Sequence, residues 1–201
     1  MSLDNDEHDL SDEERETLAE LVHIGVGKAC DSLNAMLSSQ VTWDIPVITL
    51  NDVERYRTLD SNGEMVASSL GFQGGIDGKV AILFSRDCGY QLTAVLNDVE
   101  VGDVDDEMME TTLNEVTNIS VNSIVGSLSN MINQRLHFQT PEFYPEHIMD
   151  VFSNHKKGKI RNMVAITTFR VTKLKVKGSF HLVFVLDSLT ELALRIRDLN
   201  T

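Results

Sequence analysis

The stretch TLNEVTNISVNSIVGSL, residues 112–128, spaces its apolar residues as an amphipathic helix does and carries Glu115 and Asn118 on its polar side. A closely similar stretch, TLAELVHIGVGKACDSL, occupies residues 17–33. The spacing predicts a helix in each stretch. The similarity predicts that the two helices are equivalent parts of a duplicated chain.

The duplication extends beyond the helices themselves. Moving the chain against itself by 95 positions, which brings Thr17 onto Thr112, aligns nine identical residues without a gap. The identical pairs are Thr17/Thr112, Leu18/Leu113, Glu20/Glu115, Ile24/Ile119, Val26/Val121, Ser32/Ser127, Leu33/Leu128, Met36/Met131 and Pro46/Pro141. Acidic residues precede both helices, and Ser11 with Glu14 forms the pattern of a capping box before the first.

The downstream halves are similar as well. GKVAILFSRDCGYQLTAVLN (78–97) and GSFHLVFVLDSLTELALRIRDL (178–199) each predict a strand followed by a helix. The turn-like segments 60–65 and 154–159 are expected to join hairpin strands. Two glycines and two phenylalanines recur between the halves: Gly78/Gly178 and Phe84/Phe184.

These patterns predict an α+β protein with pseudo-two-fold symmetry, built from two helix-plus-antiparallel-strands units. The units span about 12–100 and 105–200, and no Pro-rich or low-complexity linker separates them. We therefore expect one continuous domain over residues 1–201, of which residues 1–11 form an acidic N-terminal segment.

Each helix is predicted to present the same two faces. At about 100° per residue, the core faces combine Leu18, Val26, Ala29 and Leu33 in the first helix with Leu113, Val121, Ile124 and Leu128 in the second. The outward face carries Glu115 and Asn118 with Ile119 beside them. Asn is unfavourable inside a helix, because its side chain competes with the backbone for hydrogen bonds. An outward Asn next to a Glu therefore makes this face a candidate functional site.

Composition excludes several classes of function. Seventeen basic and thirty-one acidic residues give a net charge of −14, which disfavours binding to nucleic acid. The two cysteines lie outside any metal-binding spacing and suit a reducing compartment, and the histidines are scattered, so no metal site is predicted. The longest apolar runs are strand-sized, below the ~18 residues of a spanning helix. We expect a cytoplasmic protein that does not enter a membrane.

The outward residues resemble the motif of the CheC/CheX/FliY family of bacterial and archaeal chemotaxis phosphatases. The motif is an Asp or Ser, a Glu four positions on, an Asn three further on, and a Pro after twenty-two intervening residues. The second copy reads Thr111, Glu115, Asn118 and Pro141, and the first reads Glu16, Glu20, His23 and Pro46. Five of these eight positions match, and the duplication resembles the CheC type. GFQGGIDGKVAILF (71–84) also resembles the Gly-rich approach to an apolar strand in that family.

The resemblance implies a CheC-like fold and hydrolysis of the aspartyl-phosphate on a CheY-like response regulator. The regulator supplies the phosphoryl group, the Mg²⁺ and a lysine, so the phosphatase has no cofactor of its own. The resemblance assigns Asn118 to orienting the attacking water and Glu115 to pairing with the regulator's lysine. These roles suit phosphoryl transfer, where positioning and charge stabilisation dominate catalysis. Ile24 and Ile119 are predicted to form part of the docking surface.

The first copy departs from the motif. His23 replaces the Asn, and an imidazole differs from an amide in shape and loses its acceptor on protonation. We therefore interpret Glu20 and His23 as a degenerate second site. These departures leave an alternative function open: a non-catalytic adaptor that binds a response regulator or a CheD-like protein, the latter being a partner that the family implies for its CheC members.

Overall fold

A computed structural model describes residues 11–50, 64–131, 133–153 and 162–185 of the 201-residue chain. In chain order the elements are α1 (Asp12–Leu37), β1 (Val41–Trp43), β2 (Val47–Leu50), β3 (Met65–Gln73), β4 (Gly78–Ser85), α3 (Arg86–Asn97), the 3₁₀ helix η2 (Val101–Asp103), α4 (Asp106–Met131), β5 (His137–Phe138), β6 (Glu142–Tyr144), α5 (Met149–Ser153), β7 (Asn162–Val171) and β8 (Val176–Val185). The turns predicted at 60–65 and 154–159, and the helix predicted after residue 185, lie wholly or largely outside the described residues.

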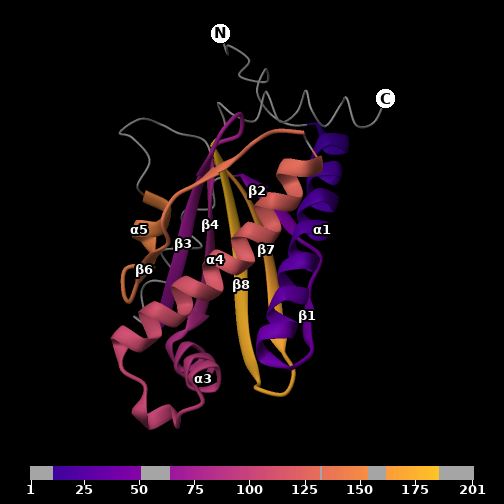
Figure 1. The fold of residues 1–201 in the computed structure, drawn as a ribbon. Helices are drawn as coiled ribbons and strands as arrows, with labels where there is room; N and C mark the ends of the chain where they lie inside the picture. The colour runs from indigo at the N-terminus through magenta and orange to yellow at the C-terminus, as the bar shows by residue number, and fades with distance from the viewer. Residues whose placement is uncertain (1–10, 51–63, 132, 154–161, 186–201) are drawn as a thin grey trace.

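Within those residues, eight strands form one antiparallel sheet in the order β1-β7-β8-β4-β3-β5, with β2 also pairing β7 and β6 also pairing β3 (Figure 1). The order is symmetric about the central pair of β4 and β8. The short strands β1 and β2 of the first unit pair with β7 of the second, and β5 and β6 of the second pair with β3 of the first. The predicted α+β class is confirmed. The duplication itself stays an inference from sequence.

The two long helices begin as their sequences predict. Ser11 Oγ accepts a hydrogen bond from the Glu14 backbone N–H at 3.2 Å, and Glu14 Oε2 accepts from the Ser11 N–H at 2.7 Å, which completes the capping box. Before α4, Asp105 Oδ1 accepts from the Met108 N–H at 2.8 Å. All eight predicted core-face residues are buried: Leu18, Val26, Ala29, Leu33, Leu113, Val121, Ile124 and Leu128.

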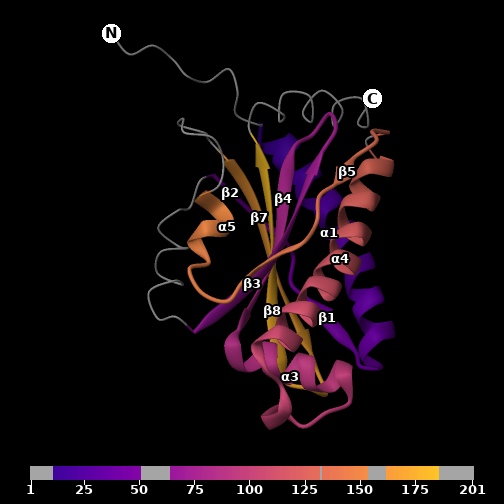
Figure 2. The same ribbon diagram turned by 60° about the vertical axis from the view of Figure 1, so that its left-hand side comes forward.

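Helices α1 and α4 lie side by side over one face of the sheet, with α3 beside the start of α4 (Figures 1 and 2). A Cβ at Gly25 would stand 3.0 Å from the Ile124 carbonyl oxygen, so glycine permits the close approach of the two helices. Across the same interface the Ser32 and Ser123 hydroxyl oxygens lie 3.0 Å apart. The polar residues opposite this interface are left facing outward.

The centre of the sheet carries a symmetric packing device. Gly178 pairs with Phe84 on one neighbouring strand and Phe169 on the other, and these two rings meet edge-on at 5.7 Å between centroids. Gly78 likewise pairs with Phe184 and Phe72, whose rings meet edge-on at 6.2 Å. Glycine is required because a side chain would fill the space that the rings occupy. The glycine and phenylalanine repeats seen in the sequence thus have one physical cause.

The opposite face of the sheet is covered in part by the short helix α5 (Figure 2). Ile148 and Val151 pack on Ala67, Ala81 and Leu83 there. Met149 adds contacts to a smaller apolar group on β7 and β8. In the described part of the chain, no helix is both long enough and apolar enough to cross a membrane.

Candidate functional site

Glu115 and Asn118 lie one turn apart near the middle of α4, and both side chains are exposed on the side away from the sheet. Neither is covered by another element, so a docking protein can reach both. Ile119 is half-buried, because it lies on the side of α4 that faces α1, where Ser123 meets Ser32. The prediction that Ile119 is exposed like Ile24 is therefore wrong in degree: Ile24 is 42% exposed, whereas Ile119 is half-buried.

The amide of Asn118 has a partner that the sequence analysis missed. Asn122, one turn further along α4, donates a hydrogen bond from Nδ2 to Asn118 Oδ1 at 3.0 Å. The bond restricts the rotation of the Asn118 side chain and uses one of the two lone pairs on Oδ1. The other lone pair and the two N–H donors are left for groups outside the chain. The signal was present in the sequence as two asparagines four positions apart.

Thr111 stands where the family motif has Asp or Ser. Its hydroxyl donates to the Glu107 carbonyl oxygen of its own helix at 3.0 Å. The side chain is exposed, and this bond is internal to the first turns of α4. Thr111 therefore keeps a hydroxyl at the motif position but uses its proton within the helix.

The first copy of the motif is built differently. Glu20 is exposed on α1, but His23 is only partly exposed, and its Nδ1 is buried without a hydrogen-bond partner among the described residues. The ring of Trp43, from β1, lies 6.0 Å from the His23 ring between centroids at an interplanar angle of 45°. The same indole lies over Gly27, where an added Cβ would be 3.3 Å from it. Trp43 therefore packs over the part of α1 that follows His23.

This packing predicts the outcome of restoring the motif. In a protein already carrying Asn118→Ala, the further change His23→Asn should not accelerate the decay of a phosphorylated receiver. Trp43 packs against this side chain, so it would limit the access of water and a phosphoryl group to an amide at this position. The measurement is the decay rate of a phosphorylated receiver with each variant. The fluorescence of Trp43, the only tryptophan in the chain, reports whether α1 and β1 keep their packing. Restored acceleration would show that the indole does not obstruct the first copy.

Other sequence features have structural explanations. The glycine- and lysine-containing stretch GVGK (25–28), which has a faint similarity to a phosphate-binding loop, lies inside α1 and forms no loop. Cys30 is fully buried, and burial, reinforced by Asp31, raises the pKa of its thiol to about 12, so the thiol is unreactive near neutral pH. No group of three His, Cys, Asp or Glu side chains close enough to hold a metal occurs in the described ranges.

Comparisons with known proteins match the middle of the chain to one family. The family model described as "Chemotaxis phosphatase CheX" matches residues 66–161, a range that includes all of α4 with Glu115 and Asn118 but excludes α1. A search of curated proteins finds no match.

Solved structures show the same fold. The FliY crystal structure from Thermotoga maritima superposes with a TM-score of 0.71 at 18% identity, covering 94% of this chain and 98% of that one. CheX in the CheX–CheY–BeF₃–Mg²⁺ complex from Borrelia burgdorferi gives 0.58 at 19% identity, covering 81% and 97%. A FliM middle domain from H. pylori gives 0.68 at 7% identity, covering 92% and 99%. The chain therefore has the fold of these chemotaxis proteins, and residues 66–161 match the CheX family model.

Proposed function

We propose that this protein is a phosphatase that accelerates hydrolysis of the aspartyl-phosphate on a CheY-like response regulator. The observation that carries the proposal is the exposed pair of Glu115 and Asn118 on α4, inside the range matched by the CheX family model. The similarity to CheX in a complex with CheY, BeF₃ and Mg²⁺ supports a receiver as the partner.

The proposed reaction requires few groups from the phosphatase itself. Water attacks phosphorus in line with the bond to the aspartyl oxygen; that bond breaks, the carboxylate leaves, and the water's proton passes to solvent or the phosphate product. The receiver's Mg²⁺, when bound, neutralises charge on the phosphoryl oxygens. Asn118 Oδ1 accepts an O–H of the water through the lone pair that Asn122 does not use, which leaves the water's own lone pair free for the attack. A neutral amide at this position avoids repelling the phosphoryl oxygens.

Glu115 is proposed to seat the helix on the receiver by pairing with a lysine. Glu115→Lys should therefore weaken binding to the phosphorylated receiver by about tenfold or more, because an attractive contact becomes a like-charge contact. The rate at saturating protein should fall much less than the affinity. Isothermal calorimetry with a receiver held in the beryllofluoride state measures the dissociation constant.

Glu110→Lys is the matched control for that change. Glu110 is exposed on the same helix, but it lies about 140° around the axis from Glu115. Glu110→Lys should change the affinity for the phosphorylated receiver by no more than about twofold, apart from the general effect of net charge on association. If both substitutions weakened receiver binding equally, Glu115 would have no specific role in docking.

The experiment that tests the proposed function is the decay of a phosphorylated receiver in the presence of Mg²⁺ and a small amount of this protein. A phosphatase should turn over, so one molecule should dephosphorylate many receivers. The decay rate should rise linearly with protein concentration while the receiver remains in excess. An unchanged decay rate across a range of receivers would contradict the proposal.

A second candidate function is a non-catalytic adaptor that binds a receiver or a CheD-like protein through α1. The observation that favours it is the first copy of the motif, where Ile24 is exposed next to Glu20 while Trp43 packs against His23. An adaptor would bind one partner per site without accelerating decay. In the same assay, slower decay that saturates at equimolar protein would support the adaptor.

A further inference from the structure

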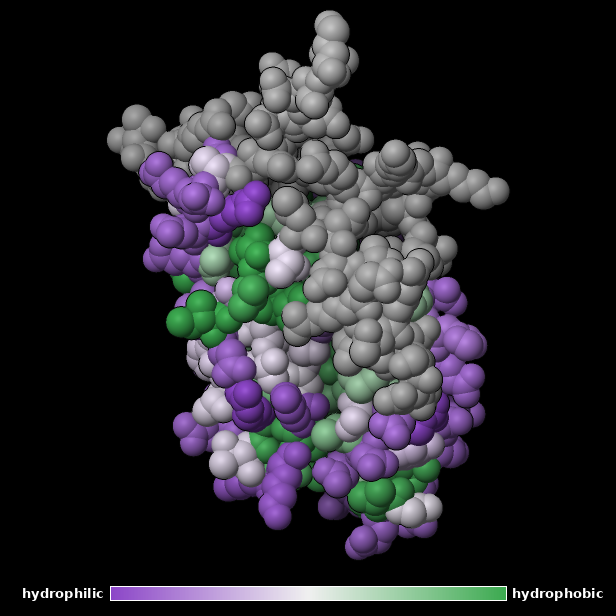
Figure 3. Space-filling view, turned by 180° about the vertical axis from the view of Figure 1, so that it is seen from behind, coloured by the Kyte–Doolittle hydropathy of each residue, from purple (hydrophilic) through white to green (hydrophobic). Residues whose placement is uncertain are grey.

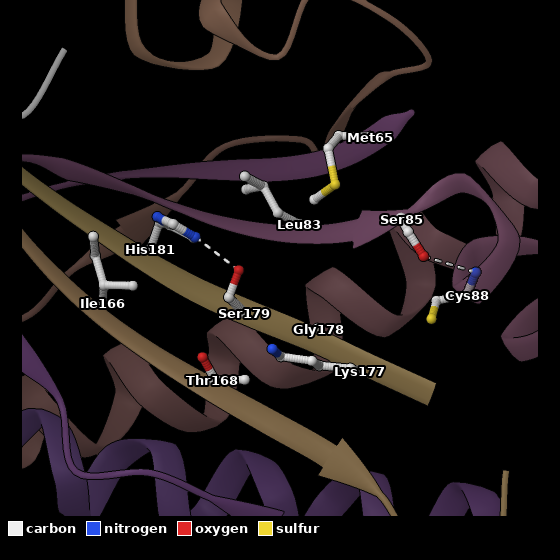
Figure 4. Close-up of a pocket in the computed structure, with 10 residues that line it drawn as sticks. All are labelled: Met65, Leu83, Ser85, Cys88, Ile166, Thr168, Lys177, Gly178, Ser179 and His181. Carbon is white, nitrogen blue, oxygen red and sulfur yellow. Dashed lines mark hydrogen bonds between the residues drawn. The ribbon is translucent and has the colours of Figure 1, made fainter. Parts of the chain in front are cut away.

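The face of the sheet opposite α1 and α4 contains a pocket of about 450 Å³ (Figure 3). Strands β3, β4, β7 and β8 supply most of its lining, and Ser85 and Cys88 add the beginning of α3 (Figure 4). Its volume is in the range of sites for small organic molecules. The pocket is separated from Glu115 and Asn118 by the full thickness of the sheet, so it is not part of the proposed catalytic site.

The strands of the sheet supply the apolar part of the pocket lining. Leu83 and Ile166 are buried at 1% and 6% exposure, and Met65 is half-buried beside them. The strand register places Leu83 opposite Ser179. The same register logic on β7 and β8 places Ile166 opposite His181, so the apolar and polar linings are adjacent on one face of the sheet. A ligand would therefore meet both kinds of surface at once.

The polar part of the lining consists of hydrogen-bonding groups and one cation. Ser179 Oγ and His181 Nε2 lie 2.8 Å apart, and Thr168 faces Ser179 from the neighbouring strand. Lys177 extends along β8 toward Thr168 (Figure 4). No aspartate or glutamate is among the described residues that line the pocket.

The ion pair next to Lys177 is formed by Arg170 and Asp44 and does not include Lys177. Arg170, opposite Lys177 on β7, holds the Asp44 carboxylate through two hydrogen bonds of 2.8 and 3.0 Å. These bonds lower the pKa of Asp44, with a smaller contribution from the charge of Lys177. In the described part of the chain Lys177 forms no ion pair of its own. Although the net charge of the chain is −14, the charged side chain among the described lining residues of this pocket is a lysine.

We propose that this pocket binds a small organic monocarboxylate with a short apolar group. The single cation matches one negative charge, the hydroxyl groups of Ser179 and Thr168 can donate to carboxylate oxygens, and Leu83 and Ile166 receive the apolar group. The site is independent of the proposed phosphatase activity, because neither its residues nor its test involves a receiver.

Hexanoate is the probe, titrated into the isotopically labelled full chain and followed by amide and histidine-ring NMR signals. Saturable shifts at Ser179, His181 and Lys177, with a dissociation constant of about 1 mM or lower, are expected. Hexanol and hexylamine, which keep the chain but lose the negative charge, should bind at least tenfold more weakly. Inorganic phosphate should also be weaker, because it lacks an apolar group.

Lys177→Glu should weaken hexanoate binding at least tenfold. Lys173→Glu is the charge-matched control, since Lys173 is exposed in the same β7–β8 connection but does not line the pocket. Thr168→Val keeps the shape of the pocket and removes one hydroxyl, and it should weaken binding by a few-fold. Absence of saturable shifts up to about 20 mM, equal binding of hexanol, tighter binding of phosphate, or equal effects of the two lysine substitutions would each overturn the proposal.

Discussion

Asn118→Ala should return the decay of a phosphorylated receiver to its intrinsic rate, a loss of about 100-fold or more of any acceleration by this protein. The physical reason is that the amide acts only by orienting water at phosphorus. Removing it deletes an interaction made during the reaction while the docking surface of α4 stays intact. Binding of the receiver in its beryllofluoride state should change by no more than about twofold.

Two further variants separate the role of the amide from general effects on α4. Asn130→Ala removes an exposed asparagine from the far end of the same helix and should leave the rate unchanged. Asn118→Asp keeps the size of the side chain but adds a negative charge, so it should lose activity as well. Acceleration that survives Asn118→Ala would assign the water-orienting role to another residue.

Gly178→Ala should lower the free energy of unfolding by about 3 kcal/mol. A Cβ at this position would lie 2.5 Å from Phe169 Cζ and 2.7 Å from Phe84 Cε1, well inside contact distance. Both rings are buried at 1% exposure and packed edge to face, so neither can move without disturbing the core. Chemical denaturation followed by circular dichroism measures the loss.

Gly126→Ala is the matched control for the effect of adding one methyl group. No heavy atom lies within 4 Å of a Cβ built at Gly126, which is inside α4. Alanine is a better helix former than glycine, so this change should be neutral or stabilise the protein by up to about 1 kcal/mol. Equal destabilisation by both changes would contradict the proposed role of the phenylalanine rings around Gly178.

Much of α1 and α4 was predictable because a single helix period decides which side chains are buried. The core face of α4 and the outward direction of Glu115 and Asn118 followed from spacing alone, and the structure places them as expected. The Ser11 capping box was visible for the same reason, since it depends on residues three positions apart. Local geometry was enough for these features.

Contacts between distant segments were not predictable in this way. The packing of Trp43 against His23 joins β1 to α1, and the sequence gives no local signal that an indole would lie there. The pocket lined by Lys177, Ser179 and Leu83 depends on the register of β4 with β8, which periodicity does not define. The glycine and phenylalanine repeats were visible, but their partners across the strands were not.

The sequence by itself determined the α+β class, the two long helices and the identity of the outward Glu and Asn, because each depends on short-range spacing along one chain. Only the tertiary structure decided that the strands of the two units pair with each other, that the two motif copies have different surroundings, and that the far face of the sheet is hollowed. Those features arise where segments far apart in sequence meet, and their side chains compete there for the same space.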